Sequence, residues 1–269
     1  MTDGNRSKRR VQAPKPRPPE RRKRQASRRV IVAAAAVVVL VALGVGVGIA
    51  VAGGSGSSIG KVPARGSLKG KLVVSQADAV HQLFAGIPQR GNVLGKASAS
   101  VTLIEYIDLQ CPFCDAFELT VLPDLVSNYV RAGKLKIEAV PLAFIGSDSQ
   151  RGRLAAIAAA KQDRMFDFME LLYANQKAEN TGWLSDDMVA RTASSIPGLN
   201  VPRLLAQRDS SSASSAATAF DHSAQAAAVH QTPTVFVGKS GAALKQVALK
   251  SPTDKASVVA AIEAAASRG

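Results

Sequence analysis

The apolar residues divide the 269-residue chain into three parts. Residues 1–29 are nearly free of them, residues 30–52 form an unbroken uncharged run of Val, Ala, Leu, Ile and Gly, and the remainder alternates short apolar segments with polar ones. At about 1.5 Å per residue, the uncharged run extends roughly 34 Å, and a hydrocarbon core is about 30 Å thick. This run therefore predicts a single N-terminal transmembrane helix.

After residue 60, the pattern of apolar residues first predicts a helix near 76–85, which leads into the folded domain. Residues 100–107 are mostly β-branched and aliphatic and residues 135–140 alternate, both as expected of strands, while residues 112–130 between them have apolar positions at helical spacing. Such a strand–helix–strand unit is expected to form a parallel pair with a right-handed crossover. A kink is expected at Pro123.

The last 120 residues predict a helical block followed by a second small unit of strands. Residues 150–230 show helical periodicity and capping signals, including Ser185 as an N-cap and Pro197-Gly198 as a helix end. Residues 234–237 and 246–249 predict two strands, and the closing helix is expected at 254–266. The predicted fold class is α/β, with a mixed sheet flanked by helices and an inserted helical block.

A Gly/Ser-rich segment at 53–60 predicts a flexible linker behind the apolar run. We therefore expect a disordered basic cytoplasmic tail at 1–29, a transmembrane helix at 30–52, a linker with the lead-in helix at 53–90, and one folded domain at 91–269 with its helical insertion at about 150–230.

Charge is concentrated in the tail, which holds twelve Lys or Arg and two acidic residues, hence +10 of the total +14. Only +4 remains for the rest of the chain, and aromatic residues make up 4 %, so a nucleic-acid partner is not expected. A basic flank stays on the cytoplasmic side of the membrane. The expected topology is single-pass in the cell membrane, with the N-terminus cytoplasmic and the C-terminal domain extracytoplasmic.

The apolar run leaves two alternatives open. Ala50-Val51-Ala52 fits a signal-peptidase site, so the segment can also be a cleaved signal, although it exceeds the usual apolar length of about 7 to 15 residues. Ser27-Arg28-Arg29 loosely matches a twin-arginine export signal, a pair that arises easily in so basic a tail.

The chain has two cysteines, Cys111 and Cys114. A disulfide between them closes a loop too short to restrict the unfolded chain much, so a purely structural bridge is disfavoured. A zinc site needs four ligands, and the three histidines show no metal-ligand spacing, so no metal is expected.

A redox role gives each residue of the motif a physical reason. Cys111 stands between a predicted strand and a predicted helix, where free amide groups and the helix dipole favour the thiolate, and Cys114 follows one turn later. Pro112 fixes the first turn, and Phe113 adds bulk without charge. Glu105 lies in the middle of the apolar strand; it is either a buried acid that relays protons to Cys114, or simply paired or surface-facing.

The segments Glu105-Tyr-Ile-Asp-Leu-Gln-Cys-Pro-Phe-Cys114 and Gln231-Thr-Pro-Thr-Val-Phe-Val237 together resemble the DsbA-like branch of the thioredoxin superfamily, in particular its membrane-tethered bacterial members. The resemblance runs from about residue 91 to the end and implies a thioredoxin-like fold. It further implies that Pro233 is a cis proline facing the dithiol and that the Thr232 backbone pairs with an extended substrate peptide. A quinone-linked membrane partner is implied as the reoxidant, with no organic cofactor or metal.

The expected function is a dithiol oxidase that introduces disulfides into exported proteins. Phe113 replaces the histidine of the best-known DsbA oxidases, and Thr232 also occurs in isomerase-like relatives, so a reductase or isomerase of the same fold is an alternative. A membrane-tethered peptide-binding chaperone with incidental cysteines is the alternative from another class.

Overall fold

The computed structural model describes Met1 and residues 74–267. The predicted tail, the apolar run at 30–52 and the Gly/Ser linker lie outside these residues, so their predicted roles stay predictions. Within the described part, no helix is both long and apolar enough to cross a membrane.

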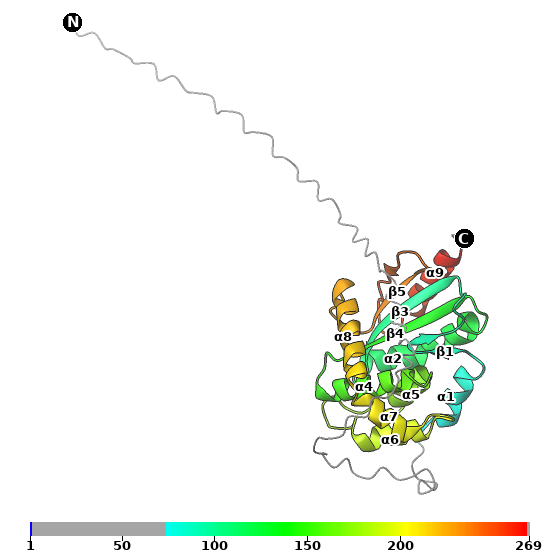
Figure 1. Cartoon of the computed structure of the whole chain (residues 1–269). Helices are drawn as coiled ribbons and strands as arrows, with labels where there is room; N and C mark the ends of the chain where they lie inside the picture. Colours follow the sequence, from blue (N-terminus) through cyan, green and yellow to red (C-terminus); the bar gives the residue numbers. More distant parts are fainter. Residues whose placement is uncertain (2–73, 268–269) are drawn as a thin grey trace. The chain divides into compact units, whose positions relative to one another are not determined.

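A six-stranded mixed sheet forms the centre of the domain (Figure 1). The order is β1-β2-β4-β3-β5-β6; β3 and β4 are parallel, and every other neighbouring pair is antiparallel. The strands are β1 (Gln89–Arg90), β2 (Val93–Leu94), β3 (Val101–Asp108), β4 (Leu135–Leu142), β5 (Thr234–Lys239) and β6 (Lys245–Gln246).

Strand β3 runs through the middle of the sheet, between β4 and β5, and seven of its eight residues are buried. Successive side chains of a strand point to opposite faces, and both faces of β3 are covered. Tyr106 hydrogen-bonds to Ser223 of helix α8 (Ser211–Ala226), with 2.9 Å between the hydroxyl oxygens. Glu105 points to the other face, and there its charge acts on residues of helices α2 (Pro112–Thr120) and α5 (Met165–Tyr173).

The crossover from β3 to β4 consists of three helical pieces: α2, α3 (Leu122–Leu125) and the π-helical turn η2 (Val126–Val130). The predicted interruption of this helix therefore occurs, at Val121, two residues before Pro123. The closing helix α9 (Lys255–Ala266) packs on β5 and β3, and Asp254 caps it by accepting a hydrogen bond from the Ser257 amide.

The inserted block consists of α4 (Ser147–Ala160), α5, α6 (Asp186–Ser194), α7 (Val201–Arg208) and α8. Ser185 caps α6 as predicted, accepting a hydrogen bond from the Met188 amide at 3.2 Å. Helix α6 ends at Ser194, before the Pro197-Gly198 pair that was expected to end it, because the chain turns at Ser195 and Ile196.

The predicted α/β class, with its mixed sheet and helical insertion, is confirmed. The lead-in helix α1 (Ala77–Phe84) lies within its predicted range. Strands β1 and β2 were not predicted, because two-residue strands show no period in the sequence. The strand predicted at 246–249 was wrong in extent: β6 ends at Gln246, and Val247 only donates one further hydrogen bond to Val235.

Candidate active site

Cys111 lies where β3 ends and α2 begins. Its amide donates to the Asp108 carbonyl at 3.0 Å, which closes a tight turn after the strand, and Cys111 is the N-cap residue of α2. Pro112 follows in the first turn of the helix, where no amide hydrogen is needed. The Cys-Pro-Phe-Cys segment is thus fixed at the amino end of a helix, as predicted.

The residues of this motif differ sharply in exposure. Cys111 is 5 % exposed, Cys114 is fully buried, and the Phe113 side chain between them is 60 % exposed. A reacting partner therefore meets Cys111 first, beside an apolar ring, while Cys114 is reached only through Cys111.

Thr232 and Pro233 lie against the cysteines although they are far away in sequence. The Thr232–Pro233 peptide bond is cis, and the Cys111 thiol donates to the Thr232 carbonyl with 3.5 Å between sulfur and oxygen. Strand β5 starts directly afterwards and pairs antiparallel with β3, so the start of β5 lies beside the end of β3. The cis bond and the contact of Thr232 with Cys111 agree with what the resemblance implies, and the substrate-binding role of Thr232 and Pro233 stays a prediction.

The two thiols have opposite acidities. The pKa of Cys111 falls from 9.0 to about 6, first because the Cys114 thiol hydrogen-bonds to it and then through Thr232 and the amides of Cys114 and Phe113, against a smaller opposing effect of burial. Burial is the main reason why the pKa of Cys114 lies well above its ordinary value. At neutral pH the reduced pair therefore carries a thiolate on Cys111 and a thiol on Cys114.

Glu105 is a fully buried acid in the middle of β3, which excludes a surface-facing position. Its neighbours across the sheet are Ala139 and Val235, and neither carboxyl oxygen has a hydrogen-bond partner among the described residues. Burial raises the pKa of Glu105 to about 8. The side chain is thus mostly protonated at neutral pH.

Two further acids, which the sequence analysis missed, lie near Glu105: Glu118 of α2 and Glu170 of α5. Both are at most 3 % exposed, and their pKa values are raised by burial and then by the charge of Glu105. We call Glu105, Glu118 and Glu170 the carboxyl cluster. A signal for Glu118 exists in the sequence, since it stands four residues after Cys114 and hence on the buried face of the helix.

Asp108 was also missed, and it organises the loop around the cysteines. Its carboxylate accepts hydrogen bonds from the amides of Gln110 (2.9 Å), Phe144 (2.8 Å) and Ile145 (3.1 Å) and from the Ser149 hydroxyl (2.6 Å). These four hydrogen bonds therefore satisfy the buried side chain of Asp108. The Asp108 backbone amide meanwhile donates to the Cys114 sulfur at 3.4 Å.

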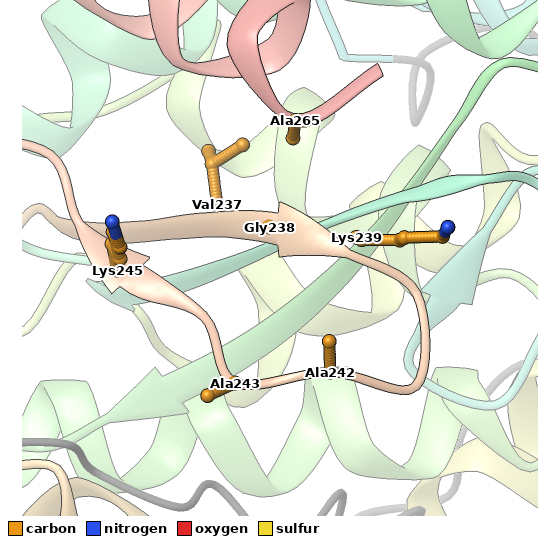
Figure 2. A pocket seen from close by; sticks show the side chains of 7 residues that line it. All are labelled: Val237, Gly238, Lys239, Ala242, Ala243, Lys245 and Ala265. Atoms are coloured by element: carbon orange, nitrogen blue, oxygen red, sulfur yellow. The ribbon is translucent and has the colours of Figure 1, made fainter. Parts of the chain in front are cut away.

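A cavity elsewhere in the domain is unrelated to the cysteines. Figure 2 shows it, about 200 Å³ in volume, lined by residues that include Val237, Lys239, Lys245 and Ala265. Lys239 pairs with Val101 at the start of β3, so this cavity lies at the end of the sheet opposite to Cys111. Within residues 74–267, no cluster of His, Cys, Asp or Glu is arranged to hold a metal ion.

The chain is similar to known proteins over most of the described residues. The family Thioredoxin_4, described as thioredoxin, matches residues 89–263. A Bacillus cereus protein, "Probable disulfide bond formation protein D", is 28 % identical over 183 residues, which cover 67 % of this chain and 84 % of the relative.

Two solved structures share the fold. BdbD from Bacillus subtilis, in its oxidised form, superposes with a TM-score of 0.59 at 24 % identity, covering 67 % of this chain and 97 % of that one. DsbA from Chlamydia trachomatis superposes with a TM-score of 0.55 at 18 % identity, and the match covers 64 % of this chain and 90 % of that one. The predicted thioredoxin-like fold is thereby confirmed.

Proposed function

Because this chain belongs to the thioredoxin family, as a thiol-disulfide oxidoreductase of its DsbA-like branch, we propose that it is a dithiol oxidase that introduces disulfide bonds into exported proteins. The reacting groups are Cys111 and Cys114. No metal or organic cofactor takes part, because the disulfide itself carries the two electrons.

The observation that carries the proposal is the position of Cys111 at the N-terminus of α2 and against Thr232, a setting that lowers its pKa to about 6. A thiolate that is stabilised in the reduced enzyme makes the disulfide a stronger oxidant. At pH 7, a thiol pKa of 6 instead of 9 favours the reduced form about tenfold, which is about 30 mV for a two-electron couple.

The reaction starts when a substrate thiolate attacks the Cys111 sulfur of the disulfide. The new bond joins the substrate to Cys111, and the electron pair of the broken bond goes to Cys114, which takes up a proton. A second substrate thiolate then attacks the substrate sulfur of the mixed disulfide. The substrate leaves oxidised, and Cys111 leaves as the thiolate that its lowered pKa favours.

Substrate binding is assigned to the Thr232–Pro233 segment beside Cys111. The Thr232 carbonyl contacts the Cys111 sulfur. Backbone groups at a strand edge can hydrogen-bond to an extended peptide whatever the side chains of that peptide are. Phe113, exposed next to Cys111, offers apolar contact to the same peptide. Glu105 is assigned to proton transfer with Cys114.

The oxidase requires an oxidising compartment, and we propose that the apolar run at 30–52 anchors it outside the cytoplasm, with the basic residues 1–29 inside. A quinone-linked membrane protein is the proposed reoxidant. Mature protein that begins at residue 53 and is washed from membranes by carbonate would show that the run is a cleaved signal.

The test is the reduction potential of the full-length chain, equilibrated against glutathione mixtures and read by thiol trapping. A value near about −120 mV, as for a strong oxidant, supports the oxidase; one near about −270 mV, as for thioredoxin, makes the protein a reductase. The chaperone alternative predicts that a C111A/C114A protein keeps full activity in cells, and loss of activity refutes that alternative.

A further inference from the structure

The main chain at Cys111 is held by a side chain from outside the Cys-Pro-Phe-Cys motif. The side-chain nitrogen of Gln176, in the turn that follows α5, donates to the Leu109 carbonyl at 3.1 Å and to the Cys111 carbonyl at 3.2 Å. A side-chain amide nitrogen carries two hydrogens, so this contact uses both of them. We call this pair of hydrogen bonds the Gln176 clamp, since it joins two carbonyls of the turn between β3 and α2.

The segment that carries Gln176 is itself fixed to the domain. The Gln176 amide donates to the Tyr173 carbonyl at 2.9 Å, at the end of α5. The neighbouring Asn175 side chain donates to the Ser75 carbonyl at 3.0 Å and accepts from the Ser75 amide at 3.1 Å. Gln176 is therefore attached to a well-anchored part of the fold, from which it can hold Cys111 in place.

The same segment contacts the turn at a second point. The buried Gln110 side chain accepts a hydrogen bond from the Asn180 amide at 2.7 Å. Residues 176–180 thus bind three successive residues of the turn, through the carbonyls of Leu109 and Cys111 and the side chain of Gln110. The position of Cys111 consequently depends on a segment that is 65 residues away in sequence.

The clamp matters more in the reduced protein than in the oxidised one. In the disulfide, a covalent bond to Cys114 fixes the Cys111 sulfur against α2. After that bond opens, the sulfur is held only by the main chain of Cys111 and by noncovalent contacts. The amides of Phe113 and Cys114 contribute to the lowered pKa of Cys111, and they can do so only while the sulfur stays at the start of the helix.

We propose that Gln176 is a positioning residue of the exchange reaction, whose side-chain amide keeps the Cys111 sulfur at the start of α2 after the disulfide has opened. The inference rests on the proposed exchange reaction at Cys111. The side-chain nitrogen of Gln176 binds carbonyl oxygens and not the sulfur, so Gln176 takes up no proton or electron. It acts on the balance between the two redox forms, because a sulfur held in place favours the thiolate and a favoured thiolate makes the disulfide a stronger oxidant.

The first test is Q176M in the full-length chain, with Q162M as the matched control. Methionine has a similar length and flexibility but no hydrogen to donate. Gln162 also holds a main-chain segment with its side chain, since it donates to the Asn200 carbonyl at 3.2 Å and accepts from the Asn200 amide at 3.0 Å. Asn200 caps α7, so this second contact is made outside the motif.

Two measurements compare these variants with the unmodified chain: the equilibrium with glutathione, read by thiol trapping, and the pH titration of the Cys111 thiolate, read by its ultraviolet absorbance. Q176M should raise the pKa of Cys111 and shift the equilibrium about two- to tenfold toward the protein disulfide, as expected for the loss of ordinary hydrogen bonds. Q162M should change neither. A Q176M protein that unfolds more easily but matches Q162M in both measurements has lost only stability, and this result refutes the proposal.

A second variant, Q176K, tests whether the hydrogen bonds themselves are the cause. The lysine ammonium group can still donate to both carbonyls, and it adds a positive charge that favours a thiolate. The disulfide of Q176K should therefore be at least as oxidising as that of the unmodified chain. A disulfide as weakly oxidising as that of Q176M would show that donation to the carbonyls is not what matters, and the proposal would fail.

The clamp can also be observed in the unmodified protein by solid-state NMR, which gives an answer even if the variants misfold. Cysteine is labelled with carbon-13 at the carbonyl and glutamine with nitrogen-15 in the side chain, and the chain has only two cysteines. A contact signal between the two labels in the reduced protein supports the clamp, and its absence refutes it. If the unmodified chain proves to be a reductase, the proposed oxidase fails, whereas the role of Gln176 is still decided by the difference between Q176M and Q162M.

Discussion

The ionisation of Cys111 predicts that the reduced protein becomes more stable as the pH rises from 6 to 8. The perturbation is the pH itself, and the reference is C111S, in which a hydroxyl that does not ionise replaces the thiol. An acidic group with a lowered folded-state pKa stabilises the fold above its unfolded-state pKa, and this stabilisation is lost as the pH falls through the folded-state value.

The magnitude follows from the two pKa values of Cys111, about 6 when folded and 9.0 ordinarily. At pH 6 the thiolate adds well under 1 kcal/mol to the free energy of unfolding, and at pH 8 it adds about 3 kcal/mol, so the gain is about 2 kcal/mol. Cys114 does not disturb this window, because its raised pKa affects stability only near and above the ordinary thiol value of 9.0.

The assay is urea unfolding of the reduced full-length chain and of C111S at pH 6, 7 and 8. The carboxyl cluster is present in both proteins, so its own pH dependence cancels in the difference. We expect the stability difference to widen by about 2 kcal/mol across the window. A difference that stays constant would mean that Cys111 is not ionised in the fold, and the argument for a strong oxidant would fail with it.

Three further predictions concern single residues. C114A mixed with a disulfide-bonded peptide should hold one half of the peptide on Cys111 as a stable mixed disulfide, visible by mass spectrometry, and release the other half as a thiol, whereas C111A should hold none; adducts on neither would contradict the role of Cys111 as the attacking thiolate. D108N should lower the free energy of unfolding by about 1 to 3 kcal/mol in urea titrations, because an amide nitrogen replaces an oxygen that accepts from backbone amides, and an unchanged midpoint would refute that account. G95A should destabilise by a similar amount, about 1 to 3 kcal/mol, since φ is +104° and the new methyl would lie 2.9 Å from the Leu135 carbonyl; wild-type stability would show that the turn relaxes freely.

Local sequence signals were sufficient for the motif itself. The apolar strand before Cys111 and Pro112 after it place the cysteine at a helix start without any knowledge of the rest of the chain. The cis bond at Pro233 was available only through the resemblance to a known family, because nothing local in the sequence distinguishes it from a trans proline.

The polar groups around the cysteines could not be predicted in the same way. Glu118 and Glu170 come near Glu105 because α2 and α5 pack on each other. The sequence spacing places Glu118 on the buried face of its helix, but it does not show that α5 brings Glu170 to the same place. The role of Asp108 could not be predicted from the sequence either, because its four hydrogen-bond partners come from its own loop and from the segment after β4.

The contact between Cys111 and Thr232 also bears on the order in which the protein acquires its chemistry. These residues are 121 positions apart, with the whole helical block between them, so the contact forms only after the C-terminal third of the chain has docked on β3. Contacts of long sequence separation form late and slowly during folding. A chain that has not finished folding therefore lacks the Thr232 contribution to the lowered pKa of Cys111, and the dithiol reaches its final acidity only when the C-terminal part is in place.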